Sequence, residues 1–412
     1  MRTSYYFLAL LLAGCPGPSP DPKVCEADSS WFTSPTQPGE VPKSETFCDF
    51  YQFSWQWFLA QVYPDPANGM PRFLENRVYQ PSGGDKQCSE EALTGVLGVQ
   101  SALVPRTIKS EDFEDVQADE NALYDQNGNV LHYNAFYSQD LCSSTEAGFA
   151  PGTLEVKAAW MTLRNPDPEF FSISVEVNGE RVFLALVGLH LAIWTPNHPE
   201  MVWASWEHKR NAPLCDGTSA SGEWLFASEA AATCLQRHPT GGTGPSPYCE
   251  SFKFNTPQPY SGSVPTESTP TNVCRKYNHG NQDGESVNGN DNTANIAAIE
   301  ELNGGLVGPT GLLTMLPSEH PMSVWANYEM VGGIWTKGGA ASGTAPVPNT
   351  QGPPNPNSPQ RGSLELANMS LETFQQGDTS AIPNCFGCHV YDPSKPLDVS
   401  HIQSRLLDDG VD

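Results

Sequence analysis

The stretch FLALVGLHLAIW at residues 183–194 decides the fold of this chain. It is an apolar run of strand length that carries one histidine, His190. Residues 170–177, just before it, are also rich in the β-branched and aromatic residues typical of strands. Asn178-Gly179 lies between the two runs and is a tight-turn pair. The sequence therefore predicts neighbouring antiparallel strands here.

Other segments show the patterns of regular structure. Asn127-Gly128 is a hairpin turn signal between apolar residues. Further strands are predicted at residues 153–163 and 201–208, and helices at residues 50–62, 294–302 and 400–407. We therefore expect an α+β fold: an antiparallel β-rich body with peripheral short helices, long irregular inserts and a C-terminal helical segment.

The domain organisation follows changes in composition along the chain. Three stretches rich in Pro, Gly, Ser or Asn favour extended or irregular backbone. The predicted divisions are a signal peptide at 1–14, a Pro-rich tether at 15–47, a β-rich body at 48–236, an irregular insert at 237–293, a helical continuation of the body at 294–336, a linker at 337–361 and a C-terminal motif-bearing segment at 362–412.

The net charge of the chain limits the classes of partner that it is expected to bind. The 412 residues include 21 Lys and Arg against 47 Asp and Glu, a formal net charge of −26. Nucleic acid is not expected as a partner, because phosphate binding needs a face rich in Lys and Arg. An acidic surface instead favours solubility or a basic protein partner.

The N-terminus has the pattern of an exported lipoprotein. Arg2 precedes an apolar run at residues 5–13 that is too short to span a bilayer. The run ends in LAGC at residues 12–15, which resembles a bacterial lipobox and implies cleavage before Cys15 and acylation of Cys15. We expect a lipid-anchored protein of the bacterial cell envelope on the periplasmic side, and Pro16 after the Cys favours the outer membrane. The alternative is an ordinary secretory signal with a coincidental Cys.

The most specific motif is Cys385-Phe386-Gly387-Cys388-His389, a C-x-x-C-H signature for attachment of a c-type haem. Two thiols at this spacing add to the two vinyl groups of one porphyrin, and the adjacent His then binds the iron as an axial ligand. We expect one covalent haem c with thioethers at Cys385 and Cys388 and with His389 on the iron. The alternatives are a thioredoxin-like redox pair, for which no βαβ unit follows, and structural zinc, which needs a second ligand pair.

The other cysteines point to disulfides. Of eleven, one is assigned to lipid and two to haem. An even remainder in an exported protein predicts up to four disulfides, in a pairing that the sequence does not determine. Cys25 is expected to pin the Pro-rich tether to the body. The eight candidates are Cys25, Cys48, Cys88, Cys142, Cys215, Cys234, Cys249 and Cys274.

The second axial ligand is left open by the sequence. No Met follows His389, which excludes a self-contained cytochrome with a downstream Met ligand. The candidates are His208, Met369, His190 and His401, or the iron keeps an open position. Each also has a structural interpretation: His190 as a hydrogen-bonded core residue, Met369 as a partly exposed helix residue and His401 as a solvated terminal residue.

The residues before the motif have helical spacing. Leu364, Ala367, Leu371 and Phe374 recur at i, i+3, i+7 and i+10, which predicts an amphipathic helix at 362–374. Such a stripe suits packing against a flat apolar group. Phe374 is therefore expected to contact the porphyrin or the core.

Several stretches resemble those of a known but uncharacterised group. WASWEHKRNAP at residues 203–213 is similar to a Trp-Ala-Thr-Phe-Glu-His-x-Asp-Asn-x-Pro stretch. FSWQWFL at 53–59, EVKAAW at 155–160 and residues 366–374 are further similar segments. The group is one of exported bacterial proteins that end in a single c-type haem motif and are loosely called cytochrome c family proteins. The resemblance implies haem binding and electron transfer.

Three functions are compatible with these patterns. The first is a monohaem c-type cytochrome lipoprotein that passes single electrons to a redox partner protein, expected to be basic, outside the cytoplasm. The second is a haem enzyme of peroxidase or oxidase type with an open distal site, which would account for the large β-rich body. The third is a β-rich binding protein with a sensory or structural haem. Nucleotide-binding, zinc-protease and serine-hydrolase motifs are absent from the sequence, and no catalytic residue is assigned.

Overall fold

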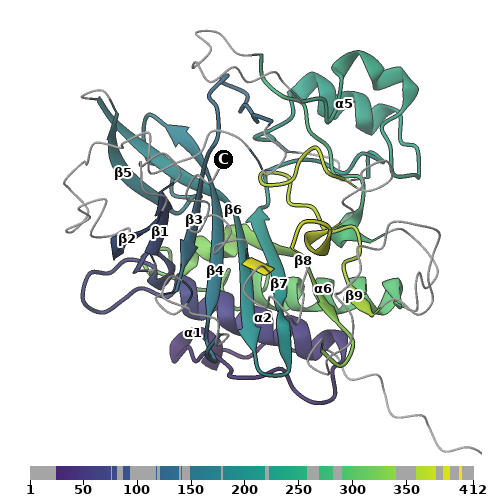
Figure 1. The fold of residues 1–412 in the computed structure, drawn as a ribbon. Coiled ribbons are helices and arrows are strands. Elements are labelled where there is room, and N and C mark those ends of the chain that lie inside the picture. Colours follow the sequence, from purple (N-terminus) through teal and green to yellow (C-terminus); the bar gives the residue numbers. More distant parts are fainter. Residues whose placement is uncertain are drawn as a thin grey trace, which may run out of the picture.

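The apolar run at residues 183–194 lies in the middle of an antiparallel sheet, and the other strands extend from it on both sides (Figure 1). Within the described residues this sheet has nine strands in the order β2-β1-β3-β4-β6-β7-β8-β9, and β5 pairs with β6 outside this path. The strands are β1 (Arg77–Gln80), β2 (Gln87–Ala92), β3 (His132–Tyr137), β4 (Leu154–Leu163), β5 (Ser172–Val177), β6 (Glu180–Thr195), β7 (His198–His208), β8 (Tyr328–Thr336) and β9 (Gln360–Gly362).

The structure is a computed structural model. It describes residues 25–75, 77–80, 87–92, 117, 121–138, 141, 149–177, 180–218, 222–257, 269–281, 290–339, 359–376, 384–389 and 399–400. Cys15, His401 and the turn pair Asn178-Gly179 lie outside these residues, as does nearly all of the helix predicted at 400–407.

Helices connect and cover the sheet. The α-helices are α1 (Ser30–Thr33), α2 (Phe47–Val62), α5 (Glu229–Arg237) and α6 (Asn292–Val307), and the 3-10 helices are η1 (Arg72–Glu75), η3 (Pro247–Phe252), η4 (Asn278–Gly280), η5 (Ser323–Asn327) and η6 (Cys385–Gly387). The α+β fold with an antiparallel β-rich body is confirmed. The strands predicted at 153–163, 170–177 and 201–208 and the helices predicted at 50–62 and 294–302 all form.

Helix α2 begins at a reciprocal pair of hydrogen bonds. The Asp49 N–H donates to Thr46 Oγ1 (3.2 Å) and the Thr46 N–H donates to Asp49 Oδ2 (2.9 Å), which is a capping box. The helix buries the residues at helical spacing, Phe53, Trp57 and Ala60. Together α2 and α6, purple and green in Figure 1, cover one face of the sheet and form the main core with it.

Alternation along β6 sends side chains to both faces of the sheet. Leu189, Leu191 and Ile193 pack into the main core with the helices. Ala192 belongs to a separate buried cluster on the other face. Because residues two positions apart in a strand share a face, His190 lies on the same side as Ala192, away from α2 and α6.

The face away from the helices is covered by residues 360–376, here called the C-terminal segment (yellow in Figure 1). It joins the sheet as β9, which pairs with β8, and then crosses neighbouring strands. Its approach is close at two glycines. A Cβ on Gly332 would overlap Ser363 Oγ, and one on Gly188 would overlap Ser370 Oγ. Small residues in β6 and β8 therefore allow this segment to lie directly on the sheet.

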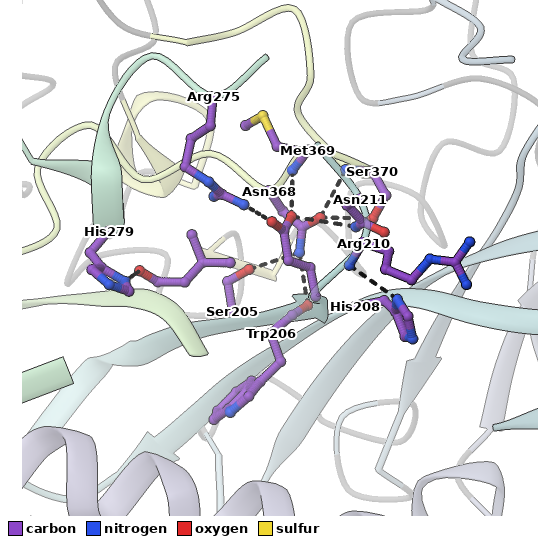
Figure 2. A network of polar contacts seen from close by, with 12 residues as sticks. Ser205, Trp206, His208, Arg210, Asn211, Arg275, His279, Asn368, Met369 and Ser370 are labelled. Atoms are coloured by element: carbon purple, nitrogen blue, oxygen red, sulfur yellow. Dashed lines mark hydrogen bonds and ion pairs between the residues drawn. The ribbon is translucent and has the colours of Figure 1, made fainter. Parts of the chain in front are cut away.

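The amphipathic helix predicted at 362–374 is wrong, because the backbone there forms turns. Its apolar stripe does pack against the sheet. Asn368 explains the irregular backbone: its side chain donates to Ser205 Oγ (3.0 Å) and to Trp206 O (2.9 Å) on β7 (Figure 2). Asn side chains that bond to backbone groups compete with regular helix, and here the competing partner is a strand of the sheet.

Disulfides fasten the parts of the chain that lie outside the sheet. Among the described side chains, the bonded pairs are Cys25–Cys48, Cys215–Cys274 and Cys234–Cys249. The first joins the start of the described chain to α2, which confirms that Cys25 pins the tether to the body. The side chains of Cys88 and Cys142 lie outside the described part.

Gly188→Ala should loosen the C-terminal segment. The new methyl group would displace Ser370 Oγ, which donates to Asn368 Oδ1 (2.7 Å), and would come within 3.0 Å of Asn368 Oδ1. We expect a loss of about 1–3 kcal/mol in the free energy of unfolding, the usual cost of overpacking a buried site. Urea denaturation followed by tryptophan fluorescence measures it.

Gly304→Ala is the matched control. Gly304 lies in α6 with no atom within 4 Å of an added Cβ. Ala in a helix is about 1 kcal/mol more favourable than Gly, so this variant should be at least as stable as the parent. Parental stability of Gly188→Ala would contradict the close packing described above.

Candidate functional site

Two rows of side chains from the central strands form the floor of a pocket. Glu155 on β4, Ala192 on β6 and Trp203 on β7 are in register across the sheet. Lys157 on β4 is in register with His190 on β6, two residues along from the first row. Both rows therefore face the C-terminal segment.

The opposite wall comes from the C-terminal segment and from the predicted haem motif. Leu366 and Glu372 line it together with Cys385, Cys388 and His389. About 690 Å³ of space between atoms, part of it open to solvent, lies between the two walls. The sheet and the motif thus meet at one pocket.

A single helical turn orients the motif. Asn384 accepts a hydrogen bond from the Phe386 N–H (3.0 Å), and the His389 N–H donates to Cys385 O (2.8 Å). Residues three and four positions apart lie on one side of such a turn, which places Cys385, Cys388 and His389 together. Phe386 is fully buried in the same apolar cluster as Trp203, which holds the turn against the sheet.

The two motif thiols are not joined to one another in a disulfide. Burial raises the pKa of the Cys385 thiol, and the nearby Glu372 carboxylate raises it further. The same two causes raise the pKa of the Cys388 thiol. Both groups are therefore neutral thiols at neutral pH.

The tautomer of His389 follows from its hydrogen bond. Its Nδ1 lies 2.8 Å from Val399 O. A carbonyl oxygen only accepts, so Nδ1 carries the proton and Nε2 carries the lone pair, as in metal-binding histidines. The ring also lies against the Trp203 ring, with 4.2 Å between centroids.

His190 makes a close hydrogen-bonded contact with a carboxylate at the same pocket. Its Nε2 lies 2.9 Å from Glu372 Oε1 and 2.8 Å from Glu372 Oε2. The Asn368 N–H also donates to Glu372 Oε2 (3.2 Å). Burial by itself would raise the pKa of Glu372, but the charge and hydrogen bond of His190, with the Lys157 charge, hold it below its usual value. The carboxyl group is thus ionised at neutral pH.

A buried polar network fixes the C-terminal segment beside this pocket (Figure 2). Glu207 Oε1 forms an ion pair with Arg275, and Glu207 Oε2 accepts from the Met369 N–H (2.8 Å). The side chain of Asn211 donates to the same oxygen (3.5 Å). Glu207 is 1% exposed and Arg275 is 7% exposed. Buried charges persist only where they are paired and hydrogen-bonded, and here the partners hold β7 and the segment together.

Several predicted haem contacts lie away from the pocket. Met369 is fully buried in another cluster, against which Phe374 also packs. His208 stacks on Phe170, with 4.1 Å between ring centroids. His401 lies outside the described residues. Among the described candidates for the second axial ligand, the pocket therefore contains His190.

The sequence reasoning missed several lining residues, among them Glu155, Lys157, Trp203 and Glu372. The first two share one face of the strand predicted at 153–163, and Trp203 lies in the strand predicted at 201–208, so strand period and pairing order together would place them. Glu372 has no such signal, because its position depends on the irregular backbone of the C-terminal segment.

Comparison of the chain with protein-family models, with curated proteins and with solved structures finds no match. Within the described part of the chain, no group of three or more His, Cys, Asp or Glu side chains is placed to hold a metal ion. No described helix is both long and apolar enough to cross a membrane.

His208 should make the protein sensitive to acid. Its Nε2 donates to Glu169 O (3.2 Å), and burial lowers its pKa from 6.5 to about 4. The unfolded chain therefore takes up this proton first, and the stability present above pH 6.5 is lost as the pH falls toward about 4. At pH 5 the loss amounts to about 2 kcal/mol. His208→Gln should remove this part of the difference in unfolding free energy between about pH 7.5 and pH 5, as measured with urea.

His238→Gln serves as the control, because His238 is exposed on the surface. It should show the parental difference between the two pH values. If His208→Gln shows the same difference in unfolding free energy between the two pH values as the parent, His208 does not contribute to the acid sensitivity.

Proposed function

We propose that this protein is a monohaem c-type cytochrome that binds one haem covalently and transfers single electrons outside the cytoplasm. The observation that supports this most directly is the shared pocket: two thiols that are not disulfide-bonded and the adjacent His389 line one cavity against the face of a sheet. The spacing of the C-x-x-C-H motif is that of haem attachment.

The residues present fit such a group. Cys385 and Cys388 would form the thioethers, and His389, with its Nε2 lone pair, would be the axial ligand. Ala192, Trp203 and Leu366 supply apolar surface for a flat macrocycle. When bound, the haem supplies a one-electron couple. The protein's part would be to orient His389 through Val399 O and to limit water in the pocket.

The thiol chemistry supports attachment over redox cycling. Redox-active C-x-x-C pairs have a thiol whose pKa is depressed by nearby positive charge or a helix N-terminus. At Cys385 and Cys388 burial and the Glu372 carboxylate act in the opposite direction and raise the pKa. Neutral thiols are poor thiolate nucleophiles, which argues against a redox-active pair.

The cellular setting is part of the same proposal. Acylation of Cys15 would anchor the protein stably, because two or more acyl chains give lasting membrane attachment. The proposed site of this anchor is the periplasmic side of a bacterial outer membrane. The disulfides are consistent with an oxidising compartment. A net charge of −26 favours a basic redox partner protein.

A second candidate function is a haem enzyme of peroxidase or oxidase type with an open distal site. It is favoured by one observation, the His190–Glu372 pair, because a histidine paired with a carboxylate is a common acid–base device. The two functions differ in whether His190 binds the iron or stays with Glu372.

Covalent attachment can be tested by removing the motif thiols. In cells with haem-maturation machinery, the parent should keep haem after denaturing electrophoresis, and Cys385→Ala/Cys388→Ala should keep none. The double variant Cys234→Ala/Cys249→Ala is the control, since this disulfide does not line the pocket, and it should keep parental haem. Haem staining and intact mass measure the outcome. A parent without haem would refute the proposed function.

A further inference from the structure

We propose that Trp203 is a positioning residue for the axial ligand: its indole ring fixes the plane of the His389 imidazole. This inference rests on the proposed haem binding and deepens it, because it concerns how the ligand that the motif supplies is oriented. Trp203 lies on β7 and belongs to no haem motif.

A hydrogen bond at one atom does not by itself define the plane of a ring. His389 Nδ1 lies 2.8 Å from Val399 O, and this contact fixes the position of one edge of the imidazole. The ring can still turn about the line that joins these two atoms, since the bond touches neither of its faces. A second contact, on a face of the ring, is needed to stop this rotation.

The Trp203 ring supplies that second contact. The centroids of the Trp203 and His389 rings are 4.2 Å apart, and their planes are inclined by 36°. Rings this close are in van der Waals contact, so turning the imidazole would bring its edge into the indole. The hydrogen bond at one edge and the flat surface against one face together define a single plane for the His389 ring.

The indole is itself held firmly by the sheet. Trp203 is 5% exposed, and its Nε1 donates to Glu200 O (3.0 Å). Its backbone lies between two strands, opposite Ala192 of β6 and Ile334 of β8. A buried side chain whose polar atom is bonded in this way has few alternative rotamers. Trp203 is therefore a rigid surface that does not move with the motif.

The attachments of the motif backbone leave this task to Trp203. Phe386 packs into the same apolar cluster, and the Asn384 side chain donates to Gln360 Oε1 (3.0 Å) and to Leu364 O (2.8 Å). These contacts place the turn, whereas the indole acts on the imidazole itself. A ligand that keeps one orientation in both oxidation states rearranges little when an electron is gained or lost, which suits single-electron transfer.

The test compares the haem-loaded parent with Trp203→Leu, which keeps apolar volume without a flat ring, and with Trp203→Phe, which keeps a flat ring. Trp194→Leu is the matched control. Trp194 packs against the same apolar cluster and contacts Phe149 (6.5 Å between centroids), but it does not line the pocket. It therefore reports a general loss of packing.

Haem staining of the denatured proteins comes first, so that loss of haem is separated from a change at the iron. The ferric forms are then compared by electron paramagnetic resonance and by the haem methyl signals in proton NMR, both of which depend on the plane of an axial imidazole. We expect one set of signals in the parent and shifted, broadened signals in Trp203→Leu. Trp203→Phe and Trp194→Leu should keep the parental signals, even where their stability falls.

Three results would overturn the inference. The first is haem-loaded Trp203→Leu with parental signals, and the second is the same change of signals in Trp194→Leu. The third is loss of haem from both Trp203→Leu and the larger Trp203→Met while Trp194→Leu keeps it, since Trp203 would then be needed for attachment and not for orientation. All three leave haem binding by the parent intact, whereas a parent without haem refutes the proposed function and this inference together.

Discussion

The attachment of the C-terminal segment to the bare face of the sheet is the contact on which the pocket depends. Glu207 forms the centre of this attachment: it pairs with Arg275 and accepts from the Met369 N–H. Removing one partner of a buried pair typically costs about 3–5 kcal/mol, because it leaves an uncompensated charge in the interior. A buried carboxylate at the end of β7 therefore determines where Glu372 and the motif can lie.

The sheet can be covered on both faces because side chains alternate between its two faces along each strand. One set of β6 side chains, including Leu189 and Leu191, fills the core with the helices. The alternate set, including Ala192, faces the segment. A strand buried on both faces reads as a continuous apolar run, which is why residues 183–194 lack the alternation of an ordinary surface strand. The one polar side chain in that run, His190, is placed at the pocket by the same period.

The strands and the motif could be predicted from the sequence because their signals are local. Apolar runs, turn pairs and capping residues act within a few residues, and the C-x-x-C-H spacing is itself the geometry of the site. The helix predicted at 362–374 failed for a non-local reason: Asn368 bonds to β7, far away along the chain. His208 and His190 both lie on predicted strands, and only the packing of the C-terminal segment decides which of them lines the pocket. Glu372 was missed for the same reason.

This arrangement bears on why a haem motif would accompany so large a β-rich body. The described motif is a single helical turn, and a short helix has too little surface to enclose a cofactor. The sheet supplies the missing wall, with Trp203 against His389 and Ala192 and Leu366 as apolar surface. In a cytochrome whose own helices wrap the haem, a downstream Met can complete the coordination; here the wall comes from strands, and the side chain that they offer is His190. That histidine is hydrogen-bonded to Glu372, so the same packing of the C-terminal segment on the sheet places both side chains at the pocket.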